Sequence, residues 1–186
     1  MHIMAIGGSP RLNGNTNYLI DQALQEAAGL GATTDKIILS QHKMSPCLVH
    51  ANCSELDSCA QKDDGVWILD KLCEADAVIL ATPVYYYDVS SWMKTFIDRN
   101  WFLRQHKRKC LARAVGIIVV GAGKSIDDTV ESLKRYINSS SFNSIPADRV
   151  FIATAYANAP GEVKNNQDVL NETRSMGRKL VESLRK

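Results

Sequence analysis

The chain has 186 residues, of which 45% are hydrophobic and 23% are charged. This size and composition are typical of one globular domain with a sizeable buried core. With 22 basic and 20 acidic residues the formal net charge is +2, which excludes the strongly basic face of a nucleic-acid-binding protein. We therefore expect no nucleic-acid partner and no membrane partner.

Apolar runs alternate with helical patterns along the first half of the chain. The first apolar run, residues 2–6, ends in two glycines, and apolar residues at helical spacing follow over 16–29. A second apolar run covers residues 33–39. The stretch at about 40–62 has no clear period, and we call it the cysteine-bearing segment because three of the five cysteines lie in it.

The second half of the chain repeats this alternation. Two aspartates begin a helix predicted over 63–73, and the continuous apolar run 77–81 predicts a buried strand that Pro83 stops. A loop with three consecutive tyrosines follows, and Ser90 or Ser91 can cap the next helix, which runs to about residue 97. The remaining expected elements are a strand over 114–120, a helix over 127–137, a strand over 149–155 and a helix over about 163–184.

Five apolar runs that alternate with helices predict an α/β fold with a parallel sheet and helices on both faces. We expect the flavodoxin-like, doubly wound strand order 2-1-3-4-5. That order brings the loop after the first strand and the tyrosine loop after the third strand to the same edge, where ligands bind in such sheets. The expected organisation is a single domain over 1–186, with the cysteine-bearing segment as an insertion at about 40–62.

Hydrogen-bond donors gather in the loop between the first strand and the first helix. The predicted helix N-terminus points its free N–H groups into this loop, and Gly14 allows close approach of the backbone. These features predict an anion site, although the loop matches neither the dinucleotide fingerprint nor a Walker A motif. The donors are Ser9, Arg11, Asn13, Asn15 and Thr16.

Three motifs in order resemble the NADPH-dependent FMN reductase family, and more closely its iron–sulfur flavoprotein branch. The first is Gly-Ser-Pro-Arg-x-x-Gly-Asn-Thr over residues 8–16. The second is Ala-Thr-Pro-Val-Tyr-Tyr-Tyr over 81–87, with Lys-Thr-Phe-Ile-Asp-Arg over 94–99. The third is the cysteine-bearing segment with the following Lys-Asp-Asp. The resemblance extends from residue 1 to about residue 125.

The resemblance implies FMN as cofactor and NAD(P)H as co-substrate. The loop at 8–16 would bind the FMN phosphate, the tyrosine loop would lie along the ribityl chain and the isoalloxazine, and the loop at 121–123 would form a third wall. No catalytic side chain is expected, because the flavin itself carries the chemistry. The candidate FMN residues are Ser9, Arg11, Asn13, Gly14, Asn15, Thr16, Pro83, Val84, Tyr85, Tyr86, Tyr87, Gly121, Ala122 and Gly123.

The cysteine-bearing segment has metal-ligand spacing, C-x2-H-x2-C-x5-C, formed by Cys47, His50, Cys53 and Cys59. The iron–sulfur branch typically has a fourth cysteine where this chain has His50. A [4Fe–4S] cluster prefers four thiolates, whereas zinc accepts three cysteines and one histidine. Three alternatives stay open: a cluster, zinc, or no metal.

Three functions remain candidates. The first is an FMN oxidoreductase that passes electrons from NAD(P)H to a small acceptor such as a quinone or free flavin. The second is an iron–sulfur flavoprotein that relays electrons between proteins. The third is an interaction protein that has lost its cofactor. A hydride from the nicotinamide to flavin N5 is the expected first step of the oxidoreductase.

Location and assembly are further expectations. The chain starts directly with a strand pattern, and its longest apolar stretch, 114–122, is far shorter than the ~18 residues of a membrane span. We expect a cytoplasmic protein. The resemblance implies a homodimer or homotetramer with the flavin near a subunit interface, to which Trp92, Trp101 and Phe102 could contribute.

Overall fold

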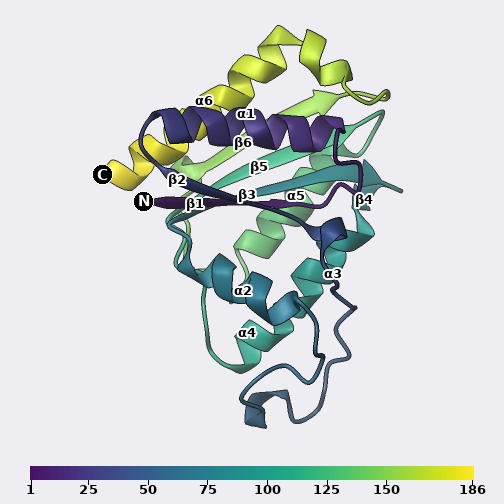
Figure 1. Ribbon diagram of the computed structural model, residues 1–186, viewed down its shortest axis with the longest axis vertical. Coiled ribbons are helices and arrows are strands. Elements are labelled where there is room, and N and C mark those ends of the chain that lie inside the picture. The colour runs from purple at the N-terminus through teal and green to yellow at the C-terminus, as the bar shows by residue number, and fades with distance from the viewer.

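The computed structural model describes all residues, 1–186, and has one central sheet with helices on both faces (Figure 1). Five parallel strands follow the order β2-β1-β3-β5-β6, which confirms the predicted flavodoxin-like order. A short strand that the sequence did not predict, β4, pairs antiparallel with β3. The strands are β1 (His2–Gly7), β2 (Thr33–Ile38), β3 (Ala77–Tyr85), β4 (Asp88–Val89), β5 (Ala114–Gly121) and β6 (Val150–Tyr156).

The helices cover the sheet in two layers. In Figure 1, α1 (Asn15–Gly29) and α6 (Gln167–Arg185) lie on one face. The other face carries α2 (Gly65–Glu74), α3 (Ser91–Arg99), α4 (Trp101–Gln105) and α5 (Ile126–Ile137). The sheet therefore separates two hydrophobic cores, as expected for a doubly wound fold.

The period of a β-strand explains why β1 is apolar throughout. Met4 and Ile6 pack into the core beneath α2 and α3, whereas Ile3 and Ala5 pack into the core beneath α1 and α6. Successive side chains of a strand point to opposite faces, so a strand covered on both sides has no polar face. The same holds for β5, where every residue is buried.

Pro83 does not end the third strand as predicted. The pairing of β3 with β1 ends at Ala81, whereas its pairing with β5 continues to Pro83. Because β1 has already ended, Pro83 lies where one edge of β3 has no strand neighbour, and a missing N–H is tolerated there. The strand then continues to Tyr85 and turns back into β4.

Two other differences concern helices. The last helix begins at Gln167 rather than near Val163, because a 3-10 turn over Glu162–Asn165 precedes it and Asn166 caps it by accepting a hydrogen bond from the Val169 N–H. The short helix α4 was not predicted. None of the helices combines the length and the hydropathy that crossing a membrane requires.

Candidate functional site

The loop between β1 and α1 leaves a helix N-terminus open. Gly14 precedes α1, and no side chain caps the helix there. The first turn also contains no acidic residue that would compete with an anion. The partial positive charge and the free N–H groups of the helix therefore face the loop that carries Ser9 and Arg11. This geometry is compatible with the anion site that the sequence predicted, which stays a prediction.

Asn17 holds this loop in shape, a role that sequence analysis missed. Its side-chain amide donates hydrogen bonds to the carbonyl oxygens of Arg11, at 2.9 Å, and Leu12, at 3.4 Å. The Gly14 N–H also donates to the Arg11 carbonyl, at 2.8 Å. A Cβ on Gly14 would lie 2.9 Å from that same oxygen, so a glycine is needed at this close approach.

Asn15 has a structural role that the sequence did not predict. Its side-chain amide donates to the Ala159 carbonyl at 2.8 Å, and its side-chain oxygen accepts from the Val163 N–H at 3.4 Å. The side chain therefore ties the loop after β6 to the start of α1. Asn15 also lines the cavity described below, and its backbone N–H and second amide hydrogen have no partner here, so its predicted contact with a phosphate stays a prediction.

Ser90 joins the two walls of the site. Its hydroxyl donates to the Gly8 carbonyl at 2.6 Å, and its N–H donates to the Thr82 hydroxyl at 3.1 Å. The Gly8 N–H in turn donates to the Ala81 carbonyl at 2.7 Å. The loop between β1 and α1, residues 8–14, is called the phosphate loop below after its predicted role. Buried hydrogen bonds hold this loop and the carboxyl end of β3 together, and Ser90 is also the cap of α3.

A cavity of about 180 Å³ opens at this edge of the sheet. The carboxyl ends of β1, β3, β5 and β6 meet there, and these strand ends and the loops that follow them form the cavity. Its lining contains the predicted residues Ser9, Arg11, Gly14, Asn15, Thr16, Pro83, Val84, Tyr85, Gly121 and Ala122, together with Val120, Ala157, Asn158 and Pro160, which were not predicted.

Four predicted residues do not line this cavity: Asn13, Tyr86, Tyr87 and Gly123. The wall from the β6 loop was missed although the predicted strand order already places the end of that strand at the same edge. A larger groove, about 440 Å³, lies between α3 and α5 on the far side of β4 and shares no residue with the predicted site. The smaller cavity is the candidate site because it alone adjoins the open helix N-terminus.

The turn between β3 and β4 presents two aromatic rings to solvent. Tyr86 is 96% exposed and Tyr87 is 69% exposed, and their rings meet edge to face at 5.6 Å. Their φ angles are 48° and 74°, the left-handed region that two-residue hairpins require and that usually takes asparagine or glycine. Tyr86 and Tyr87 therefore have strained backbone conformations. They follow directly after Tyr85, which lines the cavity.

The cysteine-bearing segment places three thiols in one neighbourhood. Cys53 and Cys59 are buried and Cys47 is half-buried. Burial raises the pKa of the Cys53 thiol, and the proximity of Cys59 and Cys47 raises it further. No group of three or more His, Cys, Asp or Glu side chains is arranged so that it could hold a metal ion.

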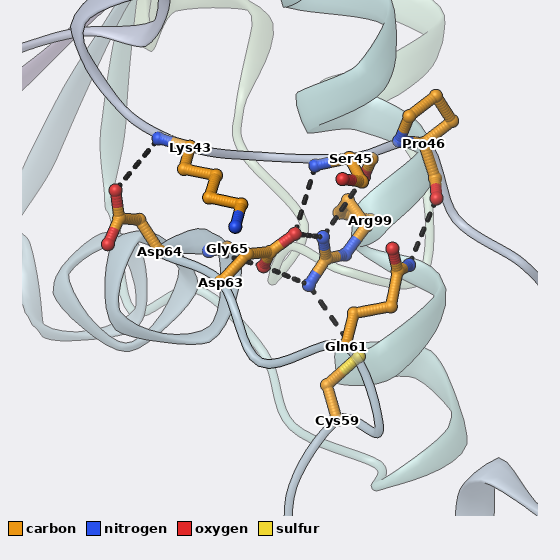
Figure 2. A network of polar contacts seen from close by, with 9 residues as sticks. All are labelled: Lys43, Ser45, Pro46, Cys59, Gln61, Asp63, Asp64, Gly65 and Arg99. Atoms are coloured by element: carbon orange, nitrogen blue, oxygen red, sulfur yellow. Dashed lines mark hydrogen bonds and ion pairs between the residues drawn. The ribbon is translucent and has the colours of Figure 1, made fainter.

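The predicted ligands do not fit a four-thiolate cluster. The segment supplies three thiols and the imidazole of His50, and the structure does not bring these side chains together as a ligand set. The Cys59 sulfur instead faces a guanidinium (Figure 2). Metal binding by Cys47, His50, Cys53 and Cys59 therefore stays a prediction.

Arg99 and Asp63 form a buried ion pair beside this segment, as Figure 2 shows. Both side chains are almost fully buried, at 1% and 4% exposed, and the two guanidinium nitrogens donate to the two carboxylate oxygens at 2.7 and 2.9 Å. Arg99 also donates to the Ser45 carbonyl at 3.0 Å and to Cys59 Sγ at 3.6 Å. A Cβ on Gly65 would lie 2.5 Å from this guanidinium, so Gly65 leaves the room that Arg99 occupies.

The ion pair changes the titration of both partners. Burial by itself would raise the pKa of Asp63, but hydrogen bonds from Arg99 and from the Ser45 and Gly65 N–H groups outweigh burial and lower it. Burial would lower the pKa of Arg99, but its bonds to Asp63 raise it. The pair is therefore held in its charged form.

Comparison with known proteins agrees with this geometry. A doubly wound parallel sheet in this order defines a flavodoxin-like protein. The chain matches the family model of the NADPH-dependent FMN reductases over residues 1–157. The chain belongs to that family and is an NAD(P)H-dependent FMN oxidoreductase, as the motifs predicted.

Relatives and solved structures extend the comparison. The chain is 32% identical over 191 residues to an iron-sulfur flavoprotein of Methanocaldococcus jannaschii, covering 98% of this chain and 96% of that protein. It is 34% identical over 185 residues to an iron-sulfur flavoprotein of Archaeoglobus fulgidus, covering 98% and 80%. The NAD(P)H:quinone oxidoreductase from Methanothermobacter marburgensis superimposes with a TM-score of 0.73 at 15% identity, covering 97% and 96%. This last match shows a shared fold.

Proposed function

We propose that the cavity of about 180 Å³ holds FMN, with the phosphate at the N-terminus of α1 and the ring beside the tyrosine turn. The observation that carries this proposal is the open helix N-terminus beside an apolar wall. Ser9, Arg11 and Thr16 supply donors for a phosphate, whereas Pro83 and Val84 supply apolar contact for the ribityl chain and ring.

Each wall of the cavity has its own task in this proposal. When bound, FMN supplies a hydride acceptor and a two-electron store, so the protein needs no side chain as acid or base at the flavin. Gly14 and Gly121 let the walls of the cavity pack tightly, because a Cβ at either position would lie 2.9 Å from atoms of Arg11 or Ile126. Tyr85, at the end of β3, limits the cavity on the side of the ring.

We propose a small molecule, such as a quinone or free flavin, as the electron acceptor. The exposed rings of Tyr86 and Tyr87 support this, because they offer a planar aromatic acceptor a stacking surface beside the cavity. The shared fold with a quinone oxidoreductase is compatible with it. The alternative is electron relay between proteins, which the names of the relatives fit.

We further propose a homodimer or homotetramer in the cytoplasm. Exposed aromatic side chains near the site, Tyr86, Tyr87 and Trp92, support an interface between copies, since aromatic residues are enriched at interfaces. All five cysteines are free thiols, which is compatible with a reducing compartment. Size-exclusion chromatography tests the assembly, and a monomeric elution volume would contradict it.

One experiment separates the three functional candidates. The protein is purified without oxygen, its visible spectrum is recorded, and FMN and then NADPH or NADH are added. We expect flavin bands that bleach with the nicotinamide and return when a quinone is added. Flavin bands that do not bleach when the nicotinamide is added would contradict the reductase function and favour electron relay between proteins. A protein that stays colourless after FMN addition would contradict both.

A further inference from the structure

Helix α3 is anchored at both of its ends by buried hydrogen bonds to loops of different function. At its N-terminus Ser90 bonds to Gly8 of the phosphate loop and to Thr82 at the end of β3. At its C-terminus Arg99 bonds to Asp63 and Cys59 around the cysteine-bearing segment. No other helix forms side-chain hydrogen bonds both to the phosphate loop and to the cysteine-bearing segment.

The Arg99 end fixes the cysteine-bearing segment. One guanidinium contacts Ser45, Cys59 and Asp63, which lie near the beginning and the end of the segment (Figure 2). The Asp63 carboxylate also accepts from the Ser45 N–H at 2.9 Å. The His106 ring, which follows α4, contacts the Leu56 carbonyl at 2.8 Å. The segment therefore has its main polar attachment at the C-terminal end of α3.

The Ser90 end fixes the FMN site. Ser90 is fully buried, its hydroxyl accepts from the Met93 N–H at 3.2 Å, and the same hydroxyl donates to Gly8. A Cβ on Gly8 would lie 2.9 Å from both Met93 Cβ and Ser90 Oγ. The phosphate loop therefore packs directly on the first turn of α3, with no space between them.

The helix between these anchors is short and rigid. Its nine residues span about 13 Å at 1.5 Å per residue. Met93 and Phe96 are fully buried in the core beneath the sheet, so the helix cannot bend without disturbing packed side chains. A displacement at one end therefore cannot be relieved by free bending of the helix.

We propose that α3 couples the cysteine-bearing segment to the FMN site, with Ser90 as the positioning residue at the phosphate loop and Arg99 as the positioning residue at Cys59. The inference rests on the proposed binding of FMN at that loop. The state of the segment, whether it is closed with free thiols or opened by modification of them, then changes the affinity for FMN. By thermodynamic reciprocity, FMN binding changes the equilibrium constant for opening of the segment by the same factor.

The test measures that reciprocity by thiol alkylation. The full chain is treated with N-ethylmaleimide with and without saturating FMN, and the rate at each cysteine is followed by mass spectrometry. Cys59 is buried and reacts only when the segment opens, so we expect FMN to slow its reaction about fivefold, within the usual range of coupling between sites. Cys110, fully buried in the core, reports global unfolding in the same sample.

The variant Arg99→Lys removes the coupling at its source, because an ammonium cannot make the paired bonds to Asp63 while it also contacts Cys59. We expect the Cys59 rate in this variant to be independent of FMN, while FMN slows Cys110 as in the wild type. Should Arg99→Lys fail to fold, Ser90→Ala at saturating FMN tests the same link from its other end.

Three results would overturn the proposal. They are an unchanged Cys59 rate when FMN binds to the wild type, slowing of Cys59 only to the extent of Cys110, and equal slowing of Cys59 in wild type and Arg99→Lys. Flavin fluorescence in the same samples reports whether FMN is bound. An absence of FMN binding refutes the proposed function, whereas FMN binding without selective protection of Cys59 refutes only the coupling.

Discussion

The hydroxyl of Ser90 donates a 2.6 Å hydrogen bond to the carbonyl oxygen of Gly8, across 82 positions of the chain. This bond joins the helix after β4 to the phosphate loop after β1, so neither loop is placed by local sequence alone. Removing the hydroxyl leaves the buried Gly8 carbonyl without that donor and α3 without its cap.

The first prediction concerns this hydroxyl. We expect Ser90→Ala to weaken FMN binding about threefold to tenfold, because a lost buried bond of this kind costs about 0.5–1.5 kcal/mol. Titration of flavin fluorescence measures the dissociation constant. Ser91→Ala is the matched control, since Ser91 is exposed and begins the helix without capping it. Equal effects of the two substitutions would contradict the positioning role.

The second prediction concerns Arg11, which lines the cavity beside the helix N-terminus. We expect Arg11→Ala to weaken FMN binding about tenfold or more, because a hydrogen bond to a charged group contributes about 1.5–3 kcal/mol. Riboflavin has no phosphate and serves as the control ligand. Its affinity should be the same in wild type and variant, and a parallel loss for both ligands would show that Arg11 does not bind the phosphate.

The third prediction concerns the pH dependence of stability at Asp63. Its pKa in the folded state lies below the ordinary value near 3.9, because the bonds from Arg99 and two N–H groups outweigh burial. The stabilisation is therefore complete above the ordinary pKa and is lost as the pH falls through the lowered one. Asp63→Asn should destabilise the fold by about 3 kcal/mol at pH 7, since it leaves Arg99 buried and unpaired.

Denaturant unfolding at several pH values checks this. The free energies of unfolding of wild type and Asp63→Asn should approach each other below about pH 4, where the wild-type carboxylate is progressively protonated. Asp21→Asn is the control, because Asp21 and Lys36 form an exposed pair of small expected value. A constant difference between wild type and Asp63→Asn down to pH 2 would argue against a charged pair.

The fourth prediction concerns Gly177, where α6 crosses α1. A Cβ at this position would lie 2.2 Å from the Ala23 carbonyl oxygen, a backbone atom that cannot move aside freely. Replacing glycine by alanine inside a helix normally stabilises by about 1 kcal/mol, but overpacking here should reverse the sign and cost about 1–3 kcal/mol. Thermal unfolding should show a lower Tm for Gly177→Ala and an equal or higher Tm for Gly29→Ala, which has open space.

The sheet order and most of the cavity could be predicted because they depend on signals close together in the sequence. Continuous apolar runs identify buried strands, and a polar loop before a helix identifies an anion site. These signals led to Ser9, Arg11 and Thr16, all of which line the cavity. The branch of the family was visible in the same way, from motif spacing.

Other features could not be predicted because their partners are far away in the sequence. Asn15 lies in a phosphate-type motif, yet its side chain bonds to Ala159, 144 positions further on. Arg99 and Asp63 lie in two of the family-like motifs, but only the folded chain shows that the two side chains pair and that Arg99 contacts Cys59. Spacing predicted a metal site at the cysteines, but spacing alone does not fix where thiols point.

The turn at Tyr86 and Tyr87 places two demands on the same residues. Folding alone favours glycine or asparagine at φ angles of 48° and 74°, so replacing one of these tyrosines by asparagine or glycine is expected to relieve backbone strain. Such a variant would survive higher temperatures and lose the aromatic surface beside the cavity proposed to hold FMN. A substitution in this turn would then raise the Tm and lower the activity. A screen for heat resistance alone would therefore select variants with reduced activity.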